Sequence, residues 1–392
     1  MTDSVMQTYA RLPVTFDRGE GVWLWDTEGR EYLDALSGIA VCGLGHAHPA
    51  VTAAVCAQAG RLVHTSNLYR VQAQEALAAD LARLSRLDRV FFGNSGAEAN
   101  EAAIKLARLH GHARGVDLPC VVVAEGSFHG RTLATLSATG NRKVQAGFEP
   151  LVQGFIRIPY NDLDALEHVA RHTREAVAVL LEPIQGEGGV VIPDAAYLEG
   201  VRRICDAHGW LMMLDEIQTG MGRTGRWFAH QHEAVLPDVM TLAKGLGNGL
   251  PIGACLARGG AATLMRPGSH GSTFGGNPLV CQAALAVVKT IETEDLTGRA
   301  AELGAHLLDR LHGSLAGLEC VKGVRGKGLM VGVELRRPCA DLVGRGLARG
   351  LLINVTAERV IRLLPPLILS RQQADRIADT LSELIRELCA EP

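Results

Sequence analysis

The sequence lacks the features that direct a chain into or across a membrane. No apolar run approaches the roughly 20 residues that a membrane-spanning helix needs. The start, Met1-Thr2-Asp3-Ser4, has neither the basic residues nor the apolar segment of a secretory signal. Excess positive charge is also missing, because 39 Lys and Arg face 42 Asp and Glu, for a net charge of −3. We therefore expect a cytoplasmic protein without a membrane or nucleic-acid partner.

The C-x-x-C motif is absent as well. The nine cysteines are an odd number and none forms a C-x-x-C pair. In a chain of 392 residues this pattern is typical of reduced, buried thiols rather than of a disulfide framework. Cys205, Cys255 and Cys281 lie in apolar helix or strand patterns, which favours a place in the core over a role as nucleophile.

Metal-ligand patterns are weak. His46 and His48 form one His-x-His pair, and His230 and His232 form another. Neither pair has a cysteine or an acidic cluster nearby at ligand spacing, so ordinary loop histidines are the better interpretation. We expect no metal.

One segment matches the sequence motif of a dinucleotide-binding site but lacks the structural context of such a site. Gly220-Met221-Gly222-Arg223-Thr224-Gly225 matches G-x-G-x-x-G, and Asp238 follows at a tolerable distance. The context argues against an NAD-dependent oxidoreductase, because residues 215–219 separate the glycines from the preceding strand and no clear helix begins after Gly225. That class remains the remote alternative.

The middle of the chain has the pattern of an α/β domain. Apolar residues make up 47% of the chain, and its length allows two or three domains. Between residues 51 and 285, short β-rich runs alternate with helical patterns. Because these runs are apolar at every position, they suit parallel strands buried on both faces of a helix-covered sheet. The clearest predicted strands are 90–92, 121–123, 177–181, 211–214 and 239–242.

The two ends of the chain predict a smaller α+β domain. Strands are expected at 329–333 and 360–364, followed by a closing helix that Ser370 and Gln373 begin with capping-box spacing. Residues 22–33 read as strand, turn and strand. We therefore predict a small domain of residues 286–392, which the N-terminal segment 1–50 helps to complete.

A glycine-rich turn follows the predicted strand at 90–92. Gly93-Asn94-Ser95-Gly96-Ala97 leads into a helix with small and apolar residues on one face. Small residues at a helix start leave backbone N–H groups free and direct the positive end of the helix dipole outward, which suits a phosphate. An ordinary glycine-rich turn fits these residues equally well.

Two carboxylates, Asp215 and Glu216, come directly after the predicted strand at 211–214. Such groups are costly to bury unless they are paired or functional. A protonated pyridine nitrogen is one natural partner, and a helix-capping role for the aspartate is the alternative.

Lys244 follows the predicted strand at 239–242 and precedes the glycine-rich segment 245–249. A lysine at the end of a buried strand is poorly placed for solvent. Desolvation or a nearby cation would lower its pKa and make the amine nucleophilic, as Schiff-base chemistry requires. A surface lysine in a flexible loop is the alternative.

These three features predict a common ligand. Ligands of open α/β sheets bind at the carboxyl ends of the strands. A phosphate-binding turn, a carboxylate and a lysine at three strand ends match the phosphate, ring nitrogen and aldehyde of pyridoxal 5′-phosphate. We therefore predict a pyridoxal-phosphate enzyme with Lys244 as its Schiff-base residue. A non-enzymatic binding module would not need Lys244 and Asp215 together.

Longer motifs run through nearly the whole chain, from Leu12 to about Leu369. They are Gly45-His46-Ala47-His48-Pro49, Phe91-Phe92-Gly93-Asn94-Ser95-Gly96-Ala97-Glu98-Ala99-Asn100, Ser127-Phe128-His129-Gly130-Arg131-Thr132, Glu182-Pro183-Ile184-Gln185-Gly186-Glu187-Gly188-Gly189, Asp215-Glu216-Ile217-Gln218-Thr219-Gly220, Leu242-Ala243-Lys244, Thr273-Phe274-Gly275-Gly276-Asn277-Pro278 and Arg362-Leu363-Leu364-Pro365-Pro366-Leu367. In this order and spacing, the sequence resembles the class III (ω-amino acid) aminotransferases, with no departure at a catalytic position.

The resemblance implies a pyridoxal-phosphate-dependent transferase fold, similar to aspartate aminotransferase, and a homodimer with shared active sites. Within the family it is greatest to the members that act on N²-acetyl-L-ornithine. These transfer its terminal amino group to 2-oxoglutarate and give N-acetyl-L-glutamate 5-semialdehyde and L-glutamate, with ping-pong kinetics, in arginine biosynthesis. Ornithine, succinylornithine, 4-aminobutyrate and succinyl-diaminopimelate are alternative substrates of the same mechanism. The residues that contact an acyl group are not identified by the resemblance.

The resemblance also implies roles for individual residues. Around the cofactor, Ser95, Gly96 and Ala97 would hold the phosphate, together with Thr273 from a partner subunit. Phe128 would lie against the ring, Asp215 would pair with the ring nitrogen, and Gln218 would lie near the ring hydroxyl. Glu182 would support the pocket, and Lys244 would form the Schiff base and transfer protons. Around the substrate, the corresponding set is Tyr9, Arg131, Glu187 and Arg362.

Two arginines and a glutamate suit two unlike substrates. Arg131 could bind the carboxylate far from the reacting amine in both half-reactions. Only glutamate also has a carboxylate beside the reacting carbon, and Arg362 would bind it. With acetylornithine, Glu187 could neutralise Arg362 and then swing away for glutamate. A static salt bridge is the alternative.

Overall fold

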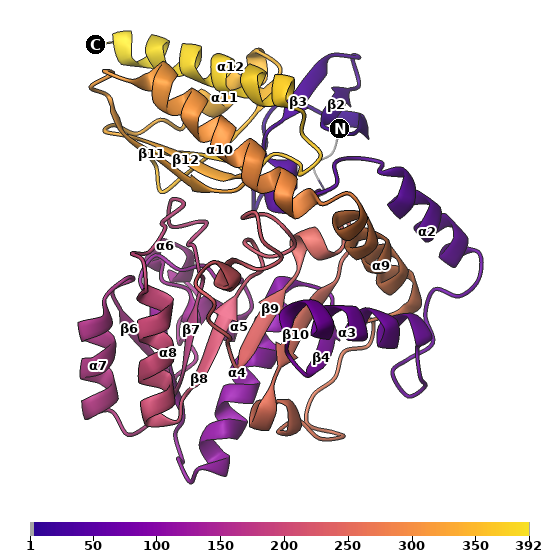
Figure 1. Cartoon of the computed structure of the whole chain (residues 1–392), viewed down its shortest axis with the longest axis vertical. Coiled ribbons are helices and arrows are strands. Elements are labelled where there is room, and N and C mark those ends of the chain that lie inside the picture. The colour runs from indigo at the N-terminus through magenta and orange to yellow at the C-terminus, as the bar shows by residue number, and fades with distance from the viewer. Residues whose placement is uncertain (1–3, 392) are drawn as a thin grey trace.

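The computed structural model describes residues 4–391 and contains three β-sheets. The largest has seven strands in the order β4-β10-β9-β8-β7-β5-β6, and lies in the lower part of Figure 1. β10 is antiparallel to both of its neighbours, and the other strands run parallel. The strands are β4 (Arg89–Gly93), β5 (Cys120–Ala124), β6 (Phe155–Ile158), β7 (Ala176–Leu181), β8 (Leu211–Asp215), β9 (Val239–Leu242) and β10 (Gly253–Ala257).

Helices cover both faces of this sheet, which explains its continuous apolar runs. Val121 and Val123 pack with side chains of α4, whereas Val122, between them, packs with α7 and α8 on the opposite face. Because successive strand residues point to opposite faces, every position of such a strand must be apolar. The helices of this part are α2 (Pro49–Ala59), α3 (Gln72–Ser85), α4 (Gly96–Ala113), α5 (Leu133–Ala138), α6 (Arg142–Gln145), α7 (Leu163–His172), α8 (Tyr197–His208) and α9 (Pro278–Thr293), with short turns α1 (Ser37–Ala40), η1 (Ala229–His232), η2 (Lys244–Leu246) and η3 (Gly259–Thr263).

Two smaller sheets join the ends of the chain in the upper part of Figure 1. One has the order β11-β12-β15-β14. The other has the order β1-β2-β3-β13, so that β13, from the C-terminal region, pairs in parallel with β3 near the N-terminus. The elements are β1 (Phe16–Glu20), β2 (Trp23–Asp26), β3 (Glu31–Asp34), β11 (Val321–Lys327), β12 (Met330–Leu335), β13 (Leu351–Leu352), β14 (Asn354–Thr356), β15 (Val360–Leu363), α10 (Leu296–Leu315), α11 (Leu342–Ala348) and α12 (Arg371–Ala390). The expected domain boundary at residue 285 falls inside α9.

The closing helix forms as its sequence predicts. Ser370 is the N-cap of α12, and its hydroxyl and the Gln373 side chain make the reciprocal bonds of a capping box. The helix buries one apolar stripe: Ala374, Ile377, Ala378, Leu381, Leu384, Ile385 and Leu388. All nine expected strands are present, including β2 and β3 near the N-terminus. The strands β1, β6, β10, β11, β13 and β14 were not expected.

The prediction of unpaired, reduced thiols is wrong at one pair. Cys320 and Cys389 form a disulfide that joins the residue before β11 to the end of α12. Cys56 is exposed rather than buried. Cys205, Cys255 and Cys281 are buried, as their apolar surroundings predict.

Within residues 4–391, no helix is both long and apolar enough to cross a membrane.

Candidate active site

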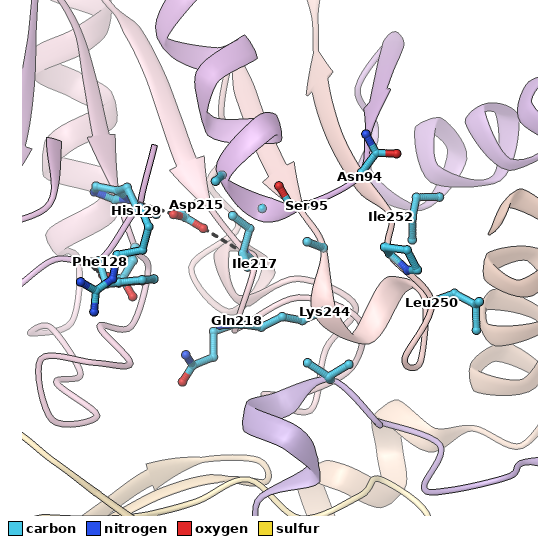
Figure 2. Close-up of a pocket in the computed structure, with 18 of the residues that line it drawn as sticks. Asn94, Ser95, Phe128, His129, Asp215, Ile217, Gln218, Lys244, Leu250 and Ile252 are labelled. Atoms are coloured by element: carbon cyan, nitrogen blue, oxygen red, sulfur yellow. Dashed lines mark hydrogen bonds and ion pairs between the residues drawn. The ribbon is translucent and has the colours of Figure 1, made fainter. Parts of the chain in front are cut away.

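A cavity of about 410 Å³ opens at the carboxyl ends of the parallel strands (Figure 2). It lies where the sheet contributes the turn after β4, the loop after β5, and the residues that follow β7, β8 and β9. Nine residues that the sequence predicts for the site line it together: Ser95, Gly96, Ala97, Phe128, Arg131, Glu182, Asp215, Gln218 and Lys244.

The start of α4 forms one wall of the cavity. Ser95 is the N-cap, and its hydroxyl accepts a hydrogen bond from the backbone N–H of Glu98 at 3.2 Å. Among residues 4–391, the N–H groups of Gly96 and Ala97 have no acceptor, as is usual in the first turn of a helix. A Cβ on Gly96 would lie 2.7 Å from Cδ1 of Ile217, so any other residue here would displace the Ile217 side chain. Two free N–H groups at the positive end of a helix form an anion site.

The two carboxylates at the end of β8, Asp215 and Glu216, have different environments. Asp215 faces the cavity. Glu216 points away and is completely buried, where it accepts hydrogen bonds from Thr219, His230 and the backbone N–H of Ala229. Burial alone would raise the pKa of Glu216, but the bonds from His230 and Thr219 lower it below its ordinary value. Glu216 is therefore a structural carboxylate, and Asp215 is the one available to a ligand.

Asp215 is held by a buried polar network that the sequence did not reveal. Its Oδ2 accepts from the amide of Asn100 at 2.7 Å and lies 2.8 Å from Nδ1 of His129, while its Oδ1 accepts from the backbone of Ile217 at 3.1 Å. The Thr241 hydroxyl in turn donates to Oδ1 of Asn100 at 2.8 Å. The carboxylate therefore has a fixed orientation toward the cavity.

Lys244 lies two residues after the end of β9 and faces the same cavity (Figure 2). Its backbone has φ of +46°, a conformation that is costly for a residue with a side chain and that clusters at functional sites. Burial lowers the pKa of the amine, and the charge of Arg362 lowers it further. A buried amine beside a cation is favoured in its neutral, nucleophilic form.

Glu182 follows β7 at the back of the cavity. It accepts hydrogen bonds from the backbone N–H groups of Phe128 at 2.9 Å and Gly186 at 3.0 Å. Burial raises the pKa of this carboxyl to about 7, with a further contribution from Asp215. Glu182 thus ties the Phe128 loop to the end of β7.

Arg362 comes from β15 in the small domain, and its side chain is completely buried. Its Nη1 donates to Glu187 at 2.7 Å and to Gln218 at 3.2 Å, and its Nε donates to Asn354 at 3.2 Å. The remaining nitrogen, Nη2, is buried without a hydrogen-bond partner in residues 4–391. The guanidinium next to Lys244 therefore keeps an unused donor.

Arg131 follows the Phe128 loop and is exposed. Its guanidinium lies 5.8 Å from the centre of the Phe128 ring. No carboxylate of the described residues forms an ion pair with it, so it can accept a carboxylate from a ligand.

Four predicted residues do not line this cavity. Arg362 contacts the cavity residue Gln218, and Glu187 contacts Arg362. The other two, Tyr9 and Thr273, lie farther from it. Tyr9 is 74% exposed in the N-terminal segment. Thr273 is exposed in a loop that lines a separate crevice with Asn67 and Pro278. Neither contacts the residues around Lys244 in this chain.

The glycine motif at 220–225 serves packing between the domains. A Cβ on Gly225 would lie 2.8 Å from Ala301 of α10. The buried Arg223 donates to the backbone oxygens of Leu329 and Pro365, across the domain boundary. Close packing, rather than a dinucleotide, explains these glycines, and no helix starts at Gly225.

The histidines of the two His-x-His pairs contact different side chains and do not converge on one point. His46 contacts Asp34, His230 contacts Glu216, and His232 contacts Thr224. Over residues 4–391 no group of His, Cys, Asp or Glu has the arrangement of a metal site.

The residues of the cavity fit the phosphate, the ring nitrogen and the aldehyde of pyridoxal phosphate. Gly96 and Ala97 offer free N–H groups to a phosphate, Asp215 offers an oriented carboxylate to a ring nitrogen, and Lys244 offers an amine favoured in its neutral form. The fold, a mainly parallel sheet with this cavity at its carboxyl edge, is that of the pyridoxal-phosphate-dependent transferases.

Within that class, the chain belongs to the class III aminotransferases. It matches the family model described as aminotransferase class-III over residues 5–385. Enzymes of this family in general depend on pyridoxal phosphate.

Known proteins resemble the chain over almost its full length. The acetylornithine aminotransferase of Nitrosomonas europaea is 59% identical over 381 residues, which cover 97% of each chain. The solved structure of the ornithine aminotransferase from Toxoplasma gondii has a TM-score of 0.96 at 35% identity, covering 99% of this chain and 94% of that one. That of N-acetylornithine aminotransferase from Stenotrophomonas maltophilia has a TM-score of 0.84 at 37% identity, covering 98% of each.

Proposed function

We propose that the chain transfers the terminal amino group of N²-acetyl-L-ornithine to 2-oxoglutarate. The products are N-acetyl-L-glutamate 5-semialdehyde and L-glutamate, so that an amino group and a carbonyl oxygen change places between the two molecules. The observation that carries this proposal is the contact of the buried Arg362 with Glu187, beside Lys244. A cation that can be neutralised or released suits a site that must take both an acylated diamine and a dicarboxylate.

Sequence similarity supports acetylornithine over related donors. The relative at 59% identity is named for acetylornithine, whereas the ornithine aminotransferase structure with the TM-score of 0.96 is 35% identical. Ornithine, succinylornithine, 4-aminobutyrate and succinyl-diaminopimelate share the mechanism and remain the alternatives to be measured.

Pyridoxal phosphate is the proposed cofactor. When bound, it supplies a carbonyl that condenses with amines and a ring that accepts electrons. Gly96 and Ala97 would donate backbone N–H groups to its phosphate, next to the Ser95 hydroxyl. Phe128 would pack against the ring, and Gln218 would lie near the ring hydroxyl.

Lys244 and Asp215 would divide the proton chemistry between them. Lys244 would attach the cofactor and then, as a free amine, move a proton at the reacting carbon of the substrate. Asp215, oriented by Asn100 and His129, would hold a proton on the ring nitrogen through its negative charge. Glu182 would keep the Phe128 loop in place.

The substrate residues would act on different carboxylates. Arg131 would bind the carboxylate far from the reacting amine in both half-reactions. Arg362 would use its free Nη2 for the carboxylate next to the reacting carbon of glutamate. Glu187 would neutralise Arg362 when acetylornithine is bound, and Tyr9 would line the same pocket.

We further propose a homodimer. Leu62, Val63, Leu68, Tyr69 and Phe274 form a set of large, exposed apolar side chains. Two loops place them side by side, because the amide of Asn67 donates to the backbone oxygens of Ser272 and Gly275. Exposed apolar groups gathered in this way are typical of an interface. A second copy on this surface would bring its Thr273 to the phosphate site of the first.

A substrate panel tests the reaction. Purified enzyme loaded with pyridoxal phosphate would be given 2-oxoglutarate and each candidate donor, and glutamate formation would be measured. We expect the highest kcat/KM with acetylornithine. A higher value with ornithine or 4-aminobutyrate would refute the substrate assignment. Borohydride should fix the cofactor on Lys244, and a modified peptide elsewhere would refute the site.

A further inference from the structure

A cavity of about 630 Å³ lies between the large and the small domain and has no lining residue in common with the active-site cavity. Residues 224–227 and 231–232 of the large domain form one side of it. The other side consists of the start of α10 and residues 326–328, at the end of β11, in the small domain. A volume of about 300–1,000 Å³ is usual for small-molecule sites. The proposed transfer reaction assigns no role to this cavity.

The two domains each contribute an unpaired cation to the cavity. Arg226 comes from the large domain and Lys327 from the end of β11 in the small domain, and both side chains line the cavity. Within residues 4–391, neither forms an ion pair with a carboxylate. Lys322, on the same strand, differs in this respect, because it is paired with Glu334 at 2.8 Å. Two unpaired cations give the cavity a positive potential.

A third basic side chain, that of His232, lies near both cations. Its Nε2 is 3.1 Å from the backbone oxygen of Thr224. Burial lowers the pKa of His232, and the charges of Lys327 and Arg226 lower it further, whereas the bond to Thr224 and the charge of Glu216 oppose the shift. Because both cations act on this one imidazole, the three basic groups converge on the same part of the cavity. Their mutual repulsion would be relieved by a bound anion.

The carboxylates near these basic groups have other hydrogen-bond partners. Asp295 lines the cavity, but it accepts the backbone N–H of Gly298 at 3.2 Å and the Thr297 hydroxyl at 3.3 Å, at the start of α10. Glu233, on which the charge of Lys327 also acts, accepts a backbone N–H of α8 at 3.2 Å. In the described part of the chain, neither carboxylate forms an ion pair with the three basic groups.

The rest of the lining includes an apolar wall, formed by the half-buried Trp227 and by Ala301, Ala305 and Leu308 of α10. The cavity thus offers positive charge to an anionic group and an apolar surface to a carbon body. A phosphate presents three acceptor oxygens and carries nearly two negative charges, so it can bind three basic groups at once. A carboxylate has only two oxygens and a single charge.

We propose that this cavity binds a small phosphate ester. Arg226, Lys327 and His232 would hold the phosphate, and the carbon body would lie against Trp227. Because the two cations belong to different domains, a bound ligand would connect the domains. It would do so beside the turn from β11 to β12, and β12 pairs with β15, the strand of Arg362. This inference does not depend on which amine is the donor at the active site.

Calorimetric titration with two probes tests the site. Phenyl phosphate has both a phosphate and an apolar body, whereas inorganic phosphate has the anionic group alone. The enzyme would be loaded with pyridoxal phosphate, so that the cofactor occupies its own phosphate site, and excess cofactor would be removed. Constant ionic strength keeps charge screening equal in all titrations.

The variants for this titration are Arg226→Ala, Lys327→Ala and the control Lys322→Ala. Lys322 is a cation on the same strand as Lys327, but it does not line the cavity and is paired with Glu334. All three side chains are exposed, so their replacement should leave the melting temperature of the ligand-free enzyme unchanged.

We expect the wild type to bind one phenyl phosphate per chain, more tightly than inorganic phosphate. Arg226→Ala and Lys327→Ala should each weaken this binding about tenfold, the lower end for a hydrogen bond to a charged group, and Lys322→Ala less than about twofold. Phenyl phosphate should also raise the melting temperature of the wild type, because it binds the folded state, and both cavity variants should lose most of this rise.

Absence of binding by the wild type, or unchanged binding in either cavity variant, would overturn the site. An equal loss in Lys322→Ala would mean general electrostatic attraction and would overturn it as well. Inorganic phosphate that binds as tightly as phenyl phosphate would refute the contact of a carbon body with Trp227.

Discussion

Nδ1 of His129 lies 2.8 Å from Oδ2 of Asp215, and both side chains are almost fully shielded from solvent. The amide of Asn100 donates to the same oxygen at 2.7 Å. Oδ2 thus has two hydrogen-bond partners, whereas within residues 4–391 Oδ1 accepts only the backbone N–H of Ile217. This arrangement leaves Oδ1 the oxygen with room for a ligand.

Replacing Asp215 should abolish most of the catalysis. Asp215→Ala removes the charge that would hold a proton on the ring nitrogen, and loss of such preorganised electrostatics costs about 10²–10³ in rate or more. Single-turnover absorbance changes would measure each half-reaction. Glu216→Gln is the matched control, because this neighbouring carboxylate is structural. It should lower thermal stability by about 1–3 kcal/mol and leave the rate per loaded site nearly unchanged. If Asp215→Ala kept more than about a tenth of kcat, Asp215 would be only structural.

The nucleophilicity of Lys244 should depend on Arg362. Because burial and the Arg362 charge lower the pKa of Lys244, the rate of cofactor attachment to apoenzyme should rise with pH and level off below the pH range of an ordinary lysine. Arg362→Gln should move the midpoint upward, since one cation is removed. Rapid mixing of apoenzyme with pyridoxal phosphate over a pH series measures this. An unchanged midpoint in Arg362→Gln would contradict the electrostatic coupling. Lys244→Ala should still bind the cofactor but lose essentially all turnover.

The buried carboxyl of Glu182 should make apoenzyme stability depend on pH. Its pKa is raised to about 7 from 4.5, so the folded chain holds a proton that the unfolded chain has released. The stabilisation is therefore full below pH 4.5 and is lost as the pH rises through about 7. Between pH 5 and 8, wild type should lose about 2–3 kcal/mol relative to Glu182→Gln. Urea unfolding of both apoenzymes measures the difference, and a pH-independent gap between them would refute the buried proton.

The site could be predicted from the sequence because its main residues lie at the ends of strands, and strand ends can be recognised from local sequence. Lys244, Asp215 and the turn at Gly96 each follow an apolar run, and parallel strands bring their carboxyl ends to one edge. The support of Asp215 was missed because Asn100 and His129 lie 115 and 86 residues away in sequence, and no local pattern connects them to it.

Elements were missed where the local signal was weak. β10 (Gly253–Ala257) has glycine and alanine in place of β-branched residues and pairs antiparallel to its neighbours. β6 has an arginine among its four residues. The disulfide joins Cys320 and Cys389 over 69 positions, and cysteine spacing alone does not specify connectivity. Each of these depends on contacts that only the folded chain creates.

Thr273 should act on the active site of the other subunit. Thr273→Ala should weaken cofactor binding about tenfold, the lower end for a lost hydrogen bond to a charged group. Thr263→Ala, an exposed threonine in η3, is the control. A hybrid dimer of one Thr273→Ala and one Lys244→Ala subunit decides the direction. If Thr273 acts across the interface, the site with the intact Lys244 binds the cofactor normally. Weak binding at that site, or a fully active monomer on a sizing column, would contradict the shared site.

The contact between Arg362 and Glu187 is asymmetric, which makes a switch physically possible. Arg362 is completely buried, whereas the glutamate side chain is 36% exposed and can leave toward solvent. If Glu187 neutralises Arg362 only while acetylornithine is bound, Glu187→Ala should slow that half-reaction more than the glutamate half-reaction. A buried charge that loses its partner costs about 3–5 kcal/mol, and water entering from the exposed side reduces this, so we expect a loss of about 100-fold.

The reciprocal variants separate a switch from a structural support. Arg362→Ala should impair glutamate and 2-oxoglutarate and largely spare acetylornithine, because only the former place a carboxylate next to the reacting carbon. Arg131→Ala should impair both donors, since each presents a distal carboxylate. Glu187→Gln keeps a hydrogen-bond acceptor without the charge and isolates the electrostatic contribution. Single-turnover measurements are required, because steady-state constants combine the two half-reactions. If Glu187→Ala slowed both half-reactions equally, Glu187 would be a fixed structural partner of Arg362. The site would then need another residue to switch between acetylornithine and glutamate.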